Sequence, residues 1–201
     1  MNLFRTFFTM AAVTICAALS AQNNPVADGK AVVVVGNARF TVLTDRLLRM
    51  EWAQDGKFED NATLAIINRN LPVPSFTASP KGNGVQIKTK SLTLLYDGSG
   101  KFDGNNLCVT FKMNGKSVTW RPGMEGKGNL LGTSRTLDGC EGRDKLRASD
   151  PMEPGILSRD GWAIVDESSR HILVKNDSDW GEWVQARPQG ERQDLYIFAY
   201  G

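Results

Sequence analysis

Short apolar runs separated by Gly, Asp and Asn turns follow one another along nearly the whole sequence. The clearest pair flanks Asn114-Gly115, a dipeptide that favours a two-residue hairpin turn because both central positions need positive φ. No apolar stripe at helical spacing persists for three turns, so the pattern predicts strands and no helix. About ten short strands with such turns predict an all-β fold, an antiparallel β-sandwich. The expected strands are 32–35, one opening at Phe40, 47–52, 85–89, 92–96, 108–113, 116–120, 162–165, 171–175, 183–186 and 195–200.

Within the run 47–52, charged and apolar residues alternate. Arg49 and Glu51 alternate with Leu48, Met50 and Trp52. Such alternation predicts a strand with one buried and one solvated face. Arg49 and Glu51 are therefore expected to face water.

The first 21 residues have the composition of a secretory signal peptide. Arg5 supplies a positive start, an apolar run covers 7–19, and small residues precede Gln22. This run is shorter than the roughly 20 residues that a membrane span needs. We therefore expect a signal peptide over 1–21, a leader over 22–29, a single domain over 30–201, and export to the periplasm or the extracellular space without membrane insertion.

The charge of the mature chain is nearly balanced. Loss of the signal removes Arg5 and leaves 23 basic and 22 acidic side chains, a net charge of +1. Without a basic stripe, no nucleic-acid partner is expected. Cys108 and Cys140 could pair in an exported protein. We do not expect this disulfide, because one cysteine lies on a strand and the other in a loop.

A long polar segment, 129–168, interrupts the strand pattern and is rich in Gly and charge in its first half. Long irregular segments inside a compact domain are usually functional loops or disordered. Pro154-Gly155 is a turn signal and a strand-like run follows at 161–166, which favours an ordered loop. A solvated loop without a role is the alternative.

Most catalytic and metal-binding patterns are missing from the sequence. His171 is the single histidine, too few for a zinc site or a Ser-His-Asp arrangement. The glycines of 126–132 have the wrong spacing for a dinucleotide loop. The segment 97–105 resembles a calcium loop only superficially, since Ser and Lys occupy two ligand positions, and a turn is expected there. Neither a metal nor another cofactor is expected.

Carboxylates and tryptophans remain as candidate binding groups. Sugar binding requires carboxylates that accept hydrogen bonds from hydroxyls and indoles that stack on apolar ring faces. Taken singly, most of these tryptophans are expected in the core and most of the acids on the surface, so composition alone indicates a secreted β domain. The residues are Asp138, Glu141, Asp144, Asp150, Glu153, Asp160, Trp52, Trp120, Trp162, Trp180 and Trp183.

Three segments in order resemble the N-terminal β-sandwich domain of glycoside hydrolase family 31, the α-glucosidase and α-xylosidase family. They are 44–52 (TDRLLRMEW), 58–76 (FEDNATLAIINRNLPVPSF) and 129–168, with NLLGTSRTLDG and EPGILSRDGWAIVDES. The final run 194–201 looks like the strand through which such a domain leads into the catalytic barrel. The resemblance covers about 30–201 and implies a galactose-mutarotase-like sandwich.

In that family, the nucleophile and the acid/base aspartate both lie in a TIM barrel that follows the sandwich. The sequence ends before any barrel, so the resemblance implies a truncated or partial product with no catalytic residue of its own. It also implies that one loop reaches the substrate pocket. The substrate-binding candidates carried over are Arg135 and Asp138 from RTLDG, and Arg159 and Asp160 from SRDGW. A structural role competes for each: a turn at Asp138, and an ion pair between Arg159 and Asp160.

The resemblance therefore favours the non-catalytic N-terminal domain of an exported retaining α-glycosidase. Its partners would be an α-linked oligosaccharide or glycoside and the missing catalytic barrel, where two carboxylates about 5 Å apart act through a covalent intermediate. The chain alone is expected to be inactive. A free-standing carbohydrate-binding module is the alternative. A mutarotase-like epimerase is less favoured, because that chemistry is expected to use a His with a Glu, and His171 stands alone.

Overall fold

The computed structural model describes residues 24–132, 152, 154–175 and 182–200. This part of the chain is nearly all β, with a single 3-10 turn, η1 (Gly29–Ala31). Its strands are β1 (Val32–Val35), β2 (Ala38–Val42), β3 (Leu47–Ala53), β4 (Ala62–Thr63), β5 (Phe76–Lys81), β6 (Gly84–Thr89), β7 (Leu92–Tyr96), β8 (Leu107–Met113), β9 (Lys116–Trp120), β10 (Trp162–Asp166), β11 (Ile172–Lys175), β12 (Glu182–Gln185) and β13 (Arg192–Ala199).

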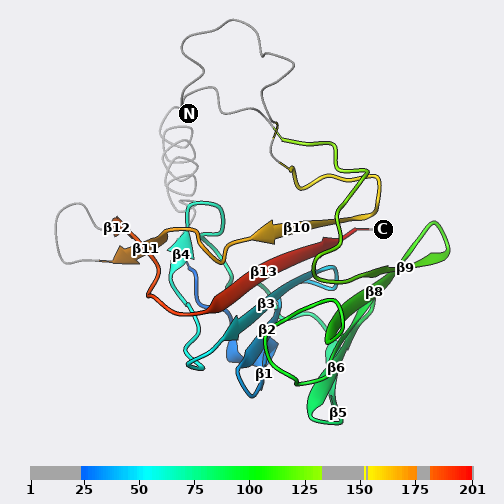
Figure 1. The fold of residues 1–201 in the computed structure, drawn as a ribbon, viewed down its shortest axis with the longest axis horizontal. Coiled ribbons are helices and arrows are strands. Elements are labelled where there is room, and N and C mark those ends of the chain that lie inside the picture. Colours follow the sequence, from blue (N-terminus) through cyan, green and yellow to red (C-terminus); the bar gives the residue numbers. More distant parts are fainter. Residues whose placement is uncertain (1–23, 133–151, 153, 176–181, 201) are drawn as a thin grey trace, which may run out of the picture.

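The strands form three sheets, and every pair of neighbouring strands is antiparallel. One five-stranded sheet has the order β1-β2-β3-β13-β10, and the other is the meander β5-β6-β7-β8-β9. A small sheet, β12-β11-β4, lies to one side of them (Figure 1). The predicted all-β antiparallel sandwich is confirmed.

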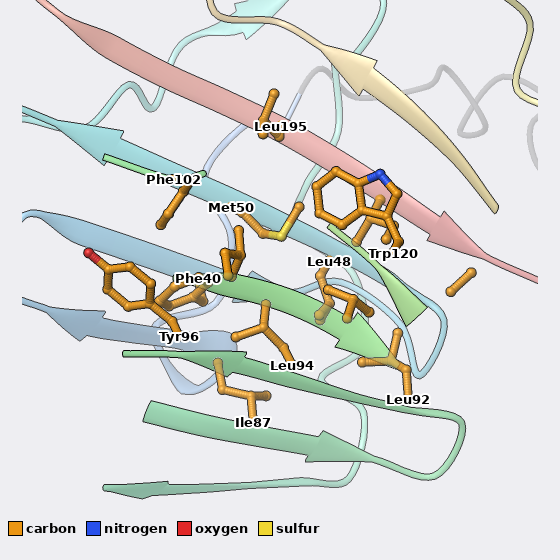
Figure 2. Packing of buried hydrophobic residues seen from close by; sticks show 14 of the residues in the cluster. Phe40, Leu48, Met50, Ile87, Leu92, Leu94, Tyr96, Phe102, Trp120 and Leu195 are labelled. Atoms are coloured by element: carbon orange, nitrogen blue, oxygen red, sulfur yellow. The ribbon is translucent and has the colours of Figure 1, made fainter. Parts of the chain in front are cut away.

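The core lies between the two five-stranded sheets (Figure 2). Phe40 and Met50 from one sheet pack with Ile87 and Leu94 from the other, and all four side chains are fully buried. They alternate with outward-facing neighbours along their strands, as the period of two requires. Tyr96 lies 5.5 Å from Phe40, centroid to centroid, within an aromatic cluster near one end of the core.

The predicted hairpin at Asn114-Gly115 is confirmed. These residues have φ values of 50° and 76°, and they join β8 to β9. Positive φ at both central positions is the conformation of a two-residue hairpin turn.

The sequence did not reveal β5, which is the edge strand of its sheet. Its residues after Phe76 are exposed, so no alternation of apolar side chains marks it. Pro80 lies within it, a residue that strands tolerate at a sheet edge because it has no N–H to donate. The preceding run 72–74, where two prolines argue against a central strand, is outside every strand, as predicted.

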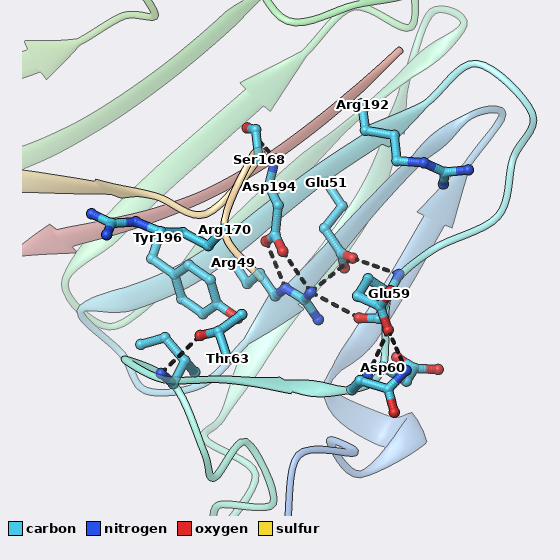
Figure 3. Close-up of polar contacts among 12 residues, drawn as sticks. Arg49, Glu51, Glu59, Asp60, Thr63, Ser168, Arg170, Arg192, Asp194 and Tyr196 are labelled. Carbon is cyan, nitrogen blue, oxygen red and sulfur yellow. Dashed lines mark hydrogen bonds and ion pairs between the residues drawn. The ribbon is translucent and has the colours of Figure 1, made fainter. Parts of the chain in front are cut away.

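The prediction that Arg49 and Glu51 face water is wrong. The two residues are 1% and 2% exposed. The outer face of β3 is covered by the segment that follows it. The carbonyl of Glu59 accepts a hydrogen bond from Arg49 (Figure 3) and another from Arg39. Strand β3 is thus buried on both faces. Its charged residues can be buried because they pair with each other.

Candidate functional site

Two of the four predicted substrate-binding residues, Arg135 and Asp138, lie outside the described residues. Arg159 and Asp160 lie directly before β10, in the turn that starts it. Arg159 is exposed, and its backbone N–H donates to the carbonyl of Gly128 at 2.8 Å. The structure therefore places this pair opposite the segment that follows β9.

The carboxylate of Asp160 accepts hydrogen bonds from other residues of the chain. Its Oδ2 accepts hydrogen bonds from the N–H of Gly128 at 2.7 Å and from the hydroxyl of Ser158 at 3.3 Å. A Cβ at Gly128 would lie 2.8 Å from Asp160 Oδ1, so this close approach requires glycine. Asp160 thus fixes the two segments to each other, a structural role that depends on one backbone donor and one hydroxyl donor.

The two segments, 128–131 and 155–159, form what we call the apolar ribbon. Leu130 donates its N–H to the carbonyl of Leu157 at 2.9 Å, and Asn129 and Ser158 form an antiparallel bridge. The Asn129 side chain adds two further links, accepting from Gly155 N and donating to Gly155 O, both at 2.9 Å. These hydrogen bonds join the two segments of the ribbon to each other.

The side chains of the apolar ribbon are unusually exposed. Leu157 is 61% exposed and Ile156 55%, and Leu130 and Leu131 are exposed as well. Exposed Met124 and Met152 flank the ribbon in the sequence. Single exposed apolar residues are normal on a protein surface, whereas a contiguous group of them marks an interaction site.

A cavity of about 740 Å³ opens between the edge strands β9 and β10 of the two large sheets. Trp120 and Trp162 lie in its wall with ring centroids 6.3 Å apart. Leu195 continues the apolar wall, and Figure 2 shows Trp120 beside β13, the strand that carries Leu195. Leu131 of the apolar ribbon also lines the cavity.

The polar groups of the cavity wall are acidic or neutral. Asp103, Glu125 and Asp166 line it, together with Asn129 and Gln193. Within the part of the chain that the structure describes, none of the lining residues is Lys, Arg or His. The sequence did not indicate this cavity, because its walls come from segments as far apart as 102–104 and 193–195.

A buried ionic network lies on the opposite face of the β13 sheet (Figure 3). Arg49 donates from Nε and Nη2 to the two carboxylate oxygens of Asp194, each at 2.8 Å, and lies 3.0 Å from Glu51 Oε1. Arg187 donates to Asp194 Oδ2 at 2.7 Å, and Arg39 donates to Glu51 Oε2 at 2.6 Å. Each buried carboxylate thus has guanidinium partners.

Burial and pairing shift the pKa values in this network. Burial raises the pKa of Glu51, and Arg49 and Arg39 only partly offset it. Burial also acts to raise the pKa of Asp194, but the hydrogen bonds and charges of Arg49 and Arg187 outweigh it and lower the pKa. Burial raises the pKa of Tyr196 to about 12. The network therefore holds Asp194 ionised, the role of a structural anion.

The remaining candidate residues have simple surroundings. His171 is exposed just before β11. Cys108 is half-buried on β8 and unpaired, and Cys140 lies outside the described residues. In the segment 97–105, side chains of Asp97 and Asp103 accept backbone N–H groups, as in ordinary turns. Over the described residues, no group of three or more His, Cys, Asp or Glu could hold a metal ion. In the same part of the chain, no helix has the length and apolar character to cross a membrane.

No family model matches the sequence, and a search of the curated proteins also found no match.

Proposed function

We propose that the chain is the non-catalytic β-sandwich domain of an exported retaining α-glycosidase of the α-glucosidase or α-xylosidase type. It would pack against the catalytic barrel and contribute the segment 129–168 to the substrate pocket. The observation that carries the proposal is the apolar ribbon, with its exposed side chains beside the predicted binding residues Arg159 and Asp160.

The order and the exposure of the apolar ribbon support its assignment as a docking surface. Its backbone is ordered by hydrogen bonds, including those that Asp160 accepts, so its exposed leucines are held in place. Covering apolar surface contributes roughly 25 cal/mol per Å². A barrel docked here would remove this surface from water and bring Arg159 to the domain boundary, where ligand sites are common.

A free-standing carbohydrate-binding module remains the second candidate. The cavity between β9 and β10 favours it, because residues of this domain line the cavity and Trp120 and Trp162 are among them. Such a module would need no barrel over the apolar ribbon.

Reading the coding sequence beyond Gly201 distinguishes the two candidates. The glycosidase proposal expects an open frame that continues into alternating strands and helices, the pattern of a parallel α/β barrel. A natural stop codon directly after Gly201 would favour the free-standing module.

Self-association of the isolated chain tests the role of the apolar ribbon. We expect the light-scattering mass of the purified chain to rise with concentration near neutral pH, and the change Leu157→Ser to reduce this rise, because the exposed ribbon joins copies together. Val34 on β1 is 57% exposed and far from the ribbon in sequence, so Val34→Ser is the matched control and should leave the association unchanged. A monomer at all concentrations would contradict the proposal.

A further inference from the structure

We propose that the cavity between β9 and β10 is a binding site for a single neutral pyranose unit. This inference rests on the proposed function, since such a unit would belong to the same class of α-glycosides. It differs in place from the predicted site, because neither Arg159 nor Asp160 lines the cavity.

The cavity is large enough to admit a sugar ring. Its volume of about 740 Å³ lies within the range of roughly 300–1,000 Å³ typical of small-molecule sites. Trp120, Trp162 and Leu195 line the cavity with the small part of their surface that the core leaves exposed, 2%, 7% and 7%. A pyranose has an apolar face of C–H groups, which can contact such apolar wall groups.

The charge of the wall selects against anionic ligands. Asp103, Glu125 and Asp166 present carboxylates, and among the described residues the lining contains no basic side chain. Carboxylates accept hydrogen bonds from hydroxyl groups and repel phosphate or carboxylate groups. Asp166 uses Oδ1 to accept the N–H of Ser168, and among the described residues no donor reaches its Oδ2. A neutral polyol therefore fits, whereas a sugar phosphate or a uronic acid does not.

The indole of Trp120 supplies a donor that lacks a partner. Its Nε1 is buried and finds no acceptor among the described residues. A buried donor without a partner costs free energy, so an acceptor oxygen supplied by a ligand after a small shift of the ring is favoured. Gln193 is held in the wall by two hydrogen bonds with the backbone of Phe102, at 2.7 and 3.0 Å. This part of the wall is thus fixed before a ligand enters.

The test titrates the purified chain with methyl α-glucopyranoside and follows tryptophan emission, with calorimetry as a second readout. We expect a saturable change, because Trp120 and Trp162 lie in the wall. Ile164 is half-buried and lines the cavity, so Ile164→Phe places a larger side chain in the space for the sugar. This change should weaken binding at least about tenfold. Glu125→Gln replaces one exposed carboxylate oxygen by an amide NH2 group and removes the charge, and it should weaken binding about fivefold without unfolding the chain. Asp28→Asn, a change at an exposed carboxylate outside the cavity, is the control and should leave binding unchanged.

Two results would overturn the proposal. One is saturable binding of the glucoside with an affinity that Glu125→Gln and Ile164→Phe leave unchanged. This result would place the sugar outside the cavity and would not affect the proposed function. The other is no binding of methyl α-glucopyranoside or methyl α-xylopyranoside up to high millimolar concentration. The proposed function is tested separately, by the coding sequence beyond Gly201 and by self-association, so the two can fail independently.

Discussion

Replacing Asp194 by Asn should lower the free energy of unfolding by about 3–5 kcal/mol, the cost of removing one partner from a buried ion pair. Asp194 is 2% exposed and accepts from Arg49 at two oxygens and from Arg187 at one. An asparagine keeps the shape but removes the carboxylate that pairs with Arg187 and leaves Arg49 with Glu51 as its remaining carboxylate partner. Urea unfolding of the two proteins at neutral pH measures the difference.

The matched control is a surface pair. Glu191 pairs with Lys101, and both side chains are about half exposed, at 51% and 49%. Glu191→Gln should change the free energy of unfolding by less than about 1 kcal/mol, as is usual for exposed ion pairs. A double change, Asp194→Leu with Arg49→Met, should recover only part of the loss, because the Arg49 charge is removed together with its partner while Arg187 still loses Asp194. An Asp194→Asn protein that unfolds within about 1 kcal/mol of the original would contradict the prediction.

The lowered pKa of Asp194 makes the difference in unfolding free energy between the original protein and Asp194→Asn depend on pH. Its folded pKa lies below the ordinary value of about 3.9, so its contribution to stability is fully present above that value and is lost as pH falls through the folded pKa. The gap between the original protein and Asp194→Asn should therefore be constant above about pH 5 and narrow below about pH 4. Glu51, whose pKa is raised by burial and to a smaller extent by the charge of Asp194, acts in the opposite direction.

The local elements of the sandwich could be predicted from the sequence because their signals are local. Alternating apolar residues mark β7 and β8, and Asn114-Gly115 marks the turn after β8. β5 could not be predicted, since its exposed residues and Pro80 carry no such pattern. An edge strand is specified by its neighbour's free hydrogen-bonding groups, which the sequence does not display.

The candidate site depends on contacts between residues that are distant in the sequence. The partners of these residues could not be predicted from the sequence. Arg49 and Asp194 are 145 positions apart, so the buried pair could not be inferred from the alternation in β3, which predicted a solvated face. Asp160 reads as a binding carboxylate in SRDGW, yet its main partner is the backbone N–H of Gly128, 32 positions earlier. Polar residues indicate chemistry, but only tertiary structure decides whether the chain or a ligand uses them.

Replacing Arg69 by Met should lower the free energy of unfolding by at least about 3 kcal/mol, because several buried acceptors lose their donor at once. Arg69 is 1% exposed and donates from Nε to the hydroxyl of Tyr196 at 2.8 Å. Its other nitrogens donate to the carbonyls of Pro25, Asp60 and Asn61, at 2.6, 3.1 and 2.7 Å. One guanidinium thus joins the chain before β1 and the segment before β4 to β13. Urea unfolding measures the loss.

Arg121 provides the matched control for Arg69→Met. It is exposed, and its side chain donates one hydrogen bond, to the carbonyl of Gly104 at 2.9 Å. Arg121→Met should therefore change the free energy of unfolding by no more than about 0.5 kcal/mol. Arg69→Lys should fall between the two, since an ammonium keeps the charge but has three donors at a single point and cannot match the fork of a guanidinium. If Arg69→Lys were as stable as the original protein, charge alone would suffice, and the role assigned to the guanidinium as a link between the three segments would be wrong.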